Sequence, residues 1–199
     1  RHVHGIVSQL SKGDTGHHHT QYNITLVPAL SRLKLRQNSR IFQQQSVLNI
    51  ISTLLDEMGI KEHAFSCDVR FESDVREYCV QYRETDFDFI SRLVAEVGLF
   101  YYFEHSEDKH TLVFCDSTAK LSALATPFPY NALSGGVAEL PFVSSFAYQH
   151  QIKPANVSLK EQSFKKPQYS FLQTSIGDNL QFQRQNYEHF DFCTFFVQH

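Results

Sequence analysis

The sequence predicts an α+β protein in which β-rich segments flank a compact module of two helices on a small sheet. Two stretches carry apolar residues at helical spacing, and several others alternate polar and apolar residues with a period of two. Aromatic residues make up 14% of the chain, with 18 Phe and 9 Tyr but no Trp. Because Phe and Tyr fit half-buried pleated surfaces, we expect a strand content above average.

The first 30 residues predict a β-hairpin. Residues 1–10 alternate in polarity, and Tyr22, Ile24 and Leu26 continue a similar pattern after the Gly/Asp-rich break at residues 12–16. A two-stranded hairpin is marginal alone and leaves its edges uncovered, so its neighbours are expected before Arg1 or in another chain. The chain has no initiator Met and opens inside this strand, so we expect it to be a piece of a longer protein.

Two helices are predicted, each with its own start and stop signal. Ser46 is the expected N-cap of the first helix, and Gly59 ends it in the left-handed conformation. Thr85 followed by Asp88 resembles a capping box at the start of the second helix, which Gly98 ends. Their apolar stripes occupy the following positions: Val47, Ile50, Ile51, Leu54, Leu55 and Met58 in the first, and Phe89, Ile90, Leu93, Val94 and Val97 in the second.

Strand-like sequence follows each helix and continues near the end of the chain. Residues 77–83, 99–105 and 110–115 alternate or are densely aromatic, and residues 106–109 form a polar turn. Residues 39–116 therefore form the expected α+β module, and residues 117–138, rich in Pro and Gly, form a connector. Within residues 139–199 we expect a second β-rich segment with strands near 142–150, 157–164 and 170–174, and an irregular tail from residue 179.

Composition and charge limit the class of protein. Of the 199 residues, 42% are hydrophobic and 20% are charged, which is ordinary globular usage. No apolar run approaches the roughly 18 residues needed to cross a bilayer, and residues 1–10 lack the apolar core of a signal peptide. A net charge of −3 argues against nucleic acid as the main partner. The basic residues Arg32, Lys34, Arg36 and Arg40 alternate with apolar ones, which favours a strand with one wet face.

Histidines offer the first candidate reaction sites. His17, His18 and His19 are adjacent, but neighbours on a strand point to opposite faces, so a solvated hairpin loop is the favoured interpretation. His105 and His110 flank the polar turn and can approach each other if that turn is a hairpin. Their spacing matches no known zinc motif, and cross-strand contact or solvation is favoured.

Carboxylates and nucleophiles give no stronger candidate. Asp86 and Asp88 lie in the first turn of a helix, where capping and the helix dipole account for them. Asp68, Glu72 and Asp74 lack the spacing of a calcium loop, and residues 134–136 do not form the Gly-x-Ser-x-Gly motif. Neither a P-loop nor a GxGxxG motif occurs. The four cysteines are dispersed and favour reduced, structural thiols: Cys67, Cys79, Cys115 and Cys193. We therefore predict no catalytic, cofactor-binding or metal-binding residue, and no enzyme.

Several segments, taken in order, resemble one family. The most specific is Gln-Tyr-Arg-Glu-Thr-Asp-Phe-Asp-Phe-Ile at residues 81–90. The others lie at residues 4–7, 26–30, 39–47, 76–93, 128–131, 164–167 and 187–192. Nearly the whole chain thus resembles VgrG, the spike protein family of bacterial type VI secretion systems, in its phage tail hub-like region. After Phe192 the chain departs from the family's usual Pro-Gly and basic aromatic continuation.

The resemblance implies a structural hub protein. Residues 1–38 would be the second half of a barrel-like β domain, and three copies of the full-length protein would form a ring on an Hcp-like tail tube, beside other baseplate proteins. A needle that meets the target membrane, and effector or adaptor regions, would lie beyond this chain. The protein would assemble at the baseplate in the bacterial cytoplasm and leave through the type VI apparatus.

Three other interpretations stay open at this point. The same architecture serves in phage or prophage tail baseplates. A metal-dependent hydrolase would use residues 17–19 or the His105/His110 pair. A small-ligand binding barrel would have a deep apolar pocket with convergent polar groups.

Overall fold

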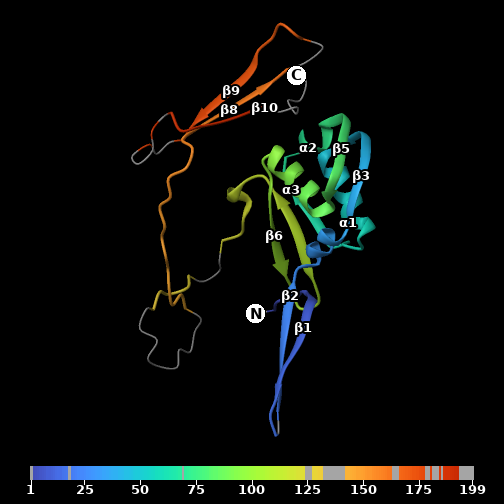
Figure 1. The fold of residues 1–199 in the computed structure, drawn as a ribbon, viewed down its shortest axis with the longest axis vertical. Helices are drawn as coiled ribbons and strands as arrows, with labels where there is room; N and C mark the ends of the chain where they lie inside the picture. Colours follow the sequence, from blue (N-terminus) through green and yellow to red (C-terminus); the bar gives the residue numbers. More distant parts are fainter. Residues whose placement is uncertain are drawn as a thin grey trace. The chain divides into compact units, whose positions relative to one another are not determined.

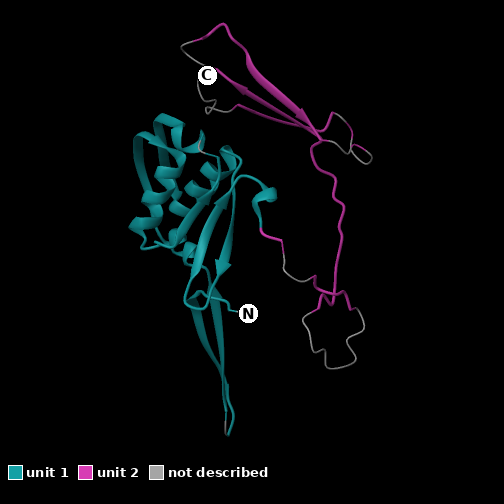
Figure 2. Cartoon of the chain, turned by 180° about the vertical axis from the view of Figure 1, so that it is seen from behind, with its two compact units in different colours: residues 1–121 teal, residues 122–199 magenta. Residues whose placement is uncertain are grey.

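The computed structural model describes residues 2–17, 19–68, 70–123, 127–131, 142–162, 166–177, 180, 184 and 186–192. The chain divides into two compact units, residues 1–121 and residues 122–199, coloured separately in Figure 2. Each unit is described by itself. Within the described residues, no helix is long and apolar enough to cross a lipid bilayer.

The first unit begins with the predicted hairpin, which is confirmed. Strands β1 (Ile6–Thr15) and β2 (Thr20–Val27) pair in antiparallel fashion, and the Gly16 amide donates to the carbonyl of His19 at 2.8 Å. β1 continues through the Gly/Asp-rich break, so the loop is shorter than the sequence suggested. The pairing register shifts between Val7 and Gln9 and between Lys12 and Thr15.

The predicted basic strand is wrong, because its first part is a helix. After Pro28, the 3₁₀-helix η1 spans Ala29–Leu35. Leu30 and Leu33 are buried, and their spacing of three matches the three residues per turn of a 3₁₀-helix. Leu35, two positions beyond Leu33, is 86% exposed. Burial of Leu33 against the module therefore decides the backbone conformation that the alternation left ambiguous.

A strand that runs directly into a helix occurs twice in the module. β3 (Gln37–Ser46) leads into α1 (Val47–Glu57), and β5 (Val75–Thr85) leads into α3 (Asp86–Glu96). β3 and β5 form a two-stranded antiparallel sheet. Figure 1 shows α1 and α3 beside this pair. Both predicted helices are confirmed.

Both helix ends follow the predicted local chemistry. The Ser46 hydroxyl accepts a hydrogen bond from the Asn49 amide at 3.3 Å, and the Thr85 hydroxyl accepts one from the Asp88 amide at 3.1 Å. These side chains satisfy amides that would otherwise lack a partner in the first turn. At the other ends Gly59 and Gly98 adopt φ values of 69° and 72°, which side chains with a Cβ disfavour.

A second, three-stranded sheet completes the module. Its order is β4 (His63–Ser66), β7 (His110–Cys115), β6 (Phe100–His105), with β4 parallel and β6 antiparallel to β7. The β6–β7 hairpin is confirmed. β4 and the short helix α2 (Arg70–Ser73) were not predicted, and the module holds two separate small sheets where one was expected.

One core joins these elements. It contains the buried positions of both helix stripes together with Leu33, Phe42, Leu112 and Phe114, and Met58 and Val97 pack against it. The rings of Phe42 and Phe89 stack with centroids 5.7 Å apart, which links β3 to α3. Each fully buried Leu, Ile or Phe contributes about 1.5–3 kcal/mol relative to an exposed position. A further 3₁₀ turn, η2 (Thr118–Lys120), follows this core.

The second unit contains a three-stranded sheet. Its order is β10 (Glu188–Phe192), β8 (Asn156–Glu161), β9 (Phe171–Ile176). The strands expected near residues 157–164 and 170–174 are present in their described parts, whereas the parallel strand β10 was not expected. The strand predicted at 142–150 is wrong, because its residues make only an isolated bridge between Val143 and Tyr130. Alternating residues without a partner strand cannot form a ladder.

Candidate functional site

The histidine loop does not gather a metal site. His17 and His19 lie at the exposed tip of the β1–β2 hairpin, and His18 lies outside the described residues. In the described part of the chain, no three His, Cys, Asp or Glu side chains come close enough to hold a metal ion.

The structure does bring His105 and His110 together. They face each other across the β6–β7 ladder, with ring centroids 5.9 Å apart. Each ring accepts a hydrogen bond from a backbone amide: His105 Nδ1 from His4 at 3.2 Å, and His110 Nε2 from Ala29 at 3.4 Å. The pair therefore joins the β1–β2 hairpin to the β6–β7 hairpin. The sequence could not predict this role, because each hydrogen bond links residues far apart in the chain.

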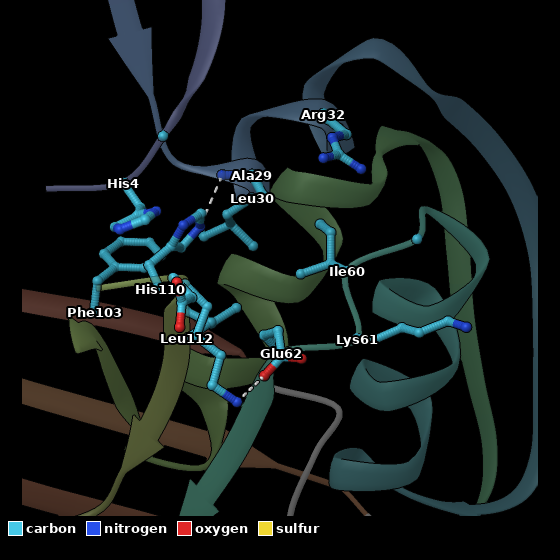
Figure 3. Close-up of a pocket in the computed structure, with 14 residues that line it drawn as sticks. His4, Ala29, Leu30, Arg32, Ile60, Lys61, Glu62, Phe103, His110 and Leu112 are labelled. Atoms are coloured by element: carbon cyan, nitrogen blue, oxygen red, sulfur yellow. Dashed lines mark hydrogen bonds and ion pairs between the residues drawn. The ribbon is translucent and has the colours of Figure 1, made fainter. Parts of the chain in front are cut away.

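A cavity of about 240 Å³ lies beside this pair. Figure 3 shows His4, Ala29 and His110 on one side of it and Glu62 with Lys61 on another. Lys109 forms an ion pair with Glu62 at 2.7 Å. Burial lowers the pKa of His110, and electrostatic coupling to His105, His4 and Arg32 lowers it further. Charged side chains line much of this cavity, so it is not the deep apolar pocket of a ligand-binding barrel.

Asp86 and Asp88 point to different partners. Asp88 receives a hydrogen bond from the Thr85 hydroxyl at 2.7 Å, as a cap residue would. Asp86 is fully buried, contacts the guanidinium of Arg36, and receives a hydrogen bond from the side-chain amide of Gln81 at 2.7 Å. The predicted interpretation as two dipole-stabilised carboxylates is therefore incomplete, since Asp86 belongs to a buried ion pair.

This ion pair extends into a network that ties the module together. Arg36 also contacts Glu57 at the end of α1 at 2.6 Å, and Arg40 contacts the same carboxylate at 3.0 Å. Burial opposes the charge on Arg36, but its hydrogen bonds to Asp86 and Glu57 outweigh this and raise the pKa of the guanidinium. The network connects β3, β5, α1 and α3, which is a structural arrangement rather than an acid–base pair.

The remaining sequence candidates are also accounted for locally. Asp68 accepts a hydrogen bond from the Arg70 amide at 3.1 Å, at the start of α2. Cys67, Cys79 and Cys115 are free thiols, and Cys193 and residues 134–136 lie outside the described residues. Burial raises the pKa of the Cys67 and Cys79 thiols, which disfavours the reactive thiolate.

Exposed apolar surface is the feature that these local contacts leave unexplained. On the β1–β2 hairpin the register places five apolar side chains on one face, and they are 57–62% exposed: Val7, Leu10, Tyr22, Ile24 and Leu26. The shift after Val7 brings Val7 and Leu10 to the same face. The opposite face carries Gln9, Ser11, Asn23 and Thr25. We call the first of these the hairpin apolar face.

A second apolar surface lies on the β3–β5 pair. Ile41 lies opposite Val80 and shares its exposed face with Tyr78 and Tyr82, while Phe42 and Cys79 point into the core. Scattered apolar residues are normal on a surface, but contiguous sets commonly mark interaction sites. The candidate functional site of this chain is therefore an assembly surface.

Comparison with known proteins identifies the family. The family described as phage tail baseplate hub (GPD) matches residues 1–199. The chain belongs to this family. It is a structural hub family, so the expectation of a non-enzymatic hub chain agrees with it, and the metal-dependent hydrolase has no support from the family.

Two Vibrio cholerae proteins are similar over 95% of the chain at 54% identity. They are the actin cross-linking toxin VgrG1 and the type VI secretion system spike protein VgrG3. The chain spans only 17% and 18% of their lengths. The resemblance to VgrG spike proteins is confirmed, in a region that is a small part of those proteins.

A solved structure shares the fold. It is the Escherichia coli c3393 protein, whose structure is described as a type VI secretion component similar to T4 phage tail proteins gp27 and gp5. The TM-score is 0.58 at 23% identity, over 67% of this chain and 37% of the other. The mixed α+β, hub-like fold of small sheets is therefore confirmed at this level, whereas a closed barrel is not among the described elements.

Proposed function

We propose that the chain is the hub region of a type VI secretion spike, and that three copies of the full-length protein form a ring on an Hcp-like tail tube. Its family and its similarity to VgrG proteins support this role. The observation that carries the proposal is the hairpin apolar face, because five large side chains on one ribbon need a partner in water.

The ring gives each exposed surface a partner. Residues 1–38 form the second half of a barrel-like domain, and strands of a neighbouring copy in the ring cover the hairpin apolar face. A cyclic trimer uses two different surfaces of each copy, which accommodates a second apolar set on β3–β5. Residues 39–116 are the α+β module, residues 117–138 connect it, and residues 139–199 form a second β-rich segment.

The partners follow from this placement. The tail tube and baseplate proteins contact the ring, and effector or adaptor proteins bind regions of the full-length spike beyond this chain. The protein assembles at the baseplate in the bacterial cytoplasm and is then exported through the type VI apparatus. Neither a nucleic acid nor a cofactor takes part, and the target membrane is met only by the needle.

Two neighbouring cross-strand pairs, one on each face of the hairpin, allow a matched test of the trimer interface. In the full-length spike, Leu10→Lys with Ile24→Lys places two charges on the hairpin apolar face, at positions that lie directly opposite each other. Size exclusion with light scattering is expected to show a trimer for the unchanged protein and a monomer for this variant, since a buried unpaired charge is costly.

The control uses the neighbouring pair on the polar face. Gln9→Lys with Thr25→Lys adds the same charge to the same strands and is expected to leave the trimer intact. A trimer that survives the Leu10/Ile24 change, with native circular dichroism in both variants, would contradict the proposal.

The phage description of the family favours one alternative, a prophage tail baseplate hub. Genes for an Hcp-like tube and a contractile sheath without capsid genes nearby would support the secretion system. Capsid and tail-fibre genes beside this one would support the prophage.

A further inference from the structure

The base of the β1–β2 hairpin is held at one point by two histidines. The His4 amide, just before β1, donates to Nδ1 of His105 at 3.2 Å. The Ala29 amide, just after β2, donates to Nε2 of His110 at 3.4 Å, as Figure 3 shows. His105 and His110 are paired residues of the β6–β7 ladder, so both ends of the hairpin rest on one rung of another sheet.

Both contacts require neutral imidazole rings. A ring nitrogen accepts a hydrogen bond only while it carries no proton, so His105 must hold its proton on Nε2 and His110 on Nδ1. Protonation turns each acceptor into a donor that faces a backbone N–H. A proton on His110 therefore converts its attraction to the Ala29 amide into a repulsion between two donors.

The groups around the two rings carry charges of both signs. His4 precedes β1 and Arg32 lies in η1. Lys61 and Glu62 come from the segment before β4, and Asp108 and Lys109 from the β6–β7 turn. Glu62 is paired with Lys109, and Glu104 of β6 accepts from the Tyr102 hydroxyl at 3.3 Å. Burial, His105, His4 and Arg32 lower the pKa of His110, in agreement with a neutral ring near pH 7.

We propose that His105 and His110 form a pH-sensitive clasp that holds the β1–β2 hairpin against the β4–β7–β6 sheet near neutral pH and releases it in mildly acidic solution. The released His110 titrates near its ordinary pKa of about 6.5, whereas the held ring resists protonation. The released state therefore binds more protons below that pH. The clasp is complete above about pH 6.5 and weakens as the pH falls below it. This proposal concerns the single chain and does not depend on the hub function.

Hydrogen exchange measured by NMR on the 199-residue chain tests the clasp. Between pH 7.5 and pH 5.5, after correction for the intrinsic exchange rate, protection of the His4 and Ala29 amides is expected to fall roughly tenfold. Amides inside α1, which is held by the buried core, are expected to keep their protection.

Two variants separate the clasp from general acid sensitivity. His105→Gln with His110→Gln supplies acceptor oxygens that do not titrate, so the pH effect on these two amides should disappear. His63→Gln is the control, because Nδ1 of His63 donates to the carbonyl of Ile60 at 3.0 Å and this bond survives protonation. That variant should keep the full pH effect.

Two results would overturn the clasp. One is equal protection of His4 and Ala29 at both pH values, and the other is the same tenfold loss in the Gln double variant. A second measurement needs no substitution: imidazole ¹⁵N shifts at pH 7.5 should place the proton of His110 on Nδ1. The opposite tautomer would also contradict the proposal.

Discussion

Two antiparallel ribbons in this chain, β1–β2 and β3–β5, are built alike but differ in how their second face is covered. Each pairs two strands of eight to eleven residues and carries one apolar face to the outside. The inner face of β3–β5 is buried under α1 and α3, whereas the other face of β1–β2 is polar beyond the Ile6/Val27 pair at its base. A ribbon covered on one side is thus stabilised within its own module, while an uncovered ribbon depends on a partner.

The largest expected effect comes from removing the contact that covers β3–β5. Phe89→Ala deletes a fully buried ring that stacks on Phe42. We expect the free energy of unfolding to fall by about 3–5 kcal/mol in urea titration. Ile24→Ala, on the uncovered ribbon, should change it by less than about 0.5 kcal/mol in the single chain. Equal losses at the two sites would remove the distinction between the ribbons.

A smaller effect is expected from the ion pair beneath β3–β5. Asp86→Ala leaves Arg36 and Gln81 without their buried acceptor. We expect a loss of about 2–3 kcal/mol, below the full cost of unpairing a buried charge because Arg36 is 30% exposed and keeps Glu57. Asp88→Asn, two residues on, loses only a charge at the helix N-terminus and should cost about 0.5 kcal/mol. If both changes cost the same, Asp86 would be a simple helix-capping charge.

The smallest of the three effects concerns the passage from strand to helix. Ser46→Ala removes the acceptor for the Asn49 amide and is expected to lower the thermal midpoint through a loss of about 1 kcal/mol. Thr53→Ala in the same helix removes a hydroxyl that bonds back to the carbonyl of Asn49, and it should be neutral or slightly stabilising. A destabilised Thr53 variant beside an unchanged Ser46 variant would show that the cap does not hold this junction.

Local chemistry made much of the module predictable from the sequence. Ser46, Thr85, Gly59 and Gly98 act within one helical turn, so their roles could be inferred from spacing alone. The β6–β7 hairpin was equally local, because its polar turn lies between an aromatic run and an apolar one. These features do not depend on which elements pack against them.

Features fixed by distant contacts were not predictable. Whether residues 29–35 form a strand or a 3₁₀-helix depends on the burial of Leu33 against the module. β10 needs β8, about thirty residues earlier, as its parallel partner. The hydrogen bonds of His105 and His110 to His4 and Ala29 span 101 and 81 residues, so no motif could announce them.

The register shift after Val7 affects how far the β1–β2 ribbon can extend. It lets the ten residues of β1 continue as one strand while Val7 and Leu10 stay on the hairpin apolar face. The ribbon therefore extends well past the module, as Figure 1 shows. At roughly 3.3 Å per residue such an arm is about 30 Å long, close to the diameter of a small domain. A partner that binds along this arm is connected to the module through one narrow ribbon. This leaves the module and the partner free to tilt relative to each other.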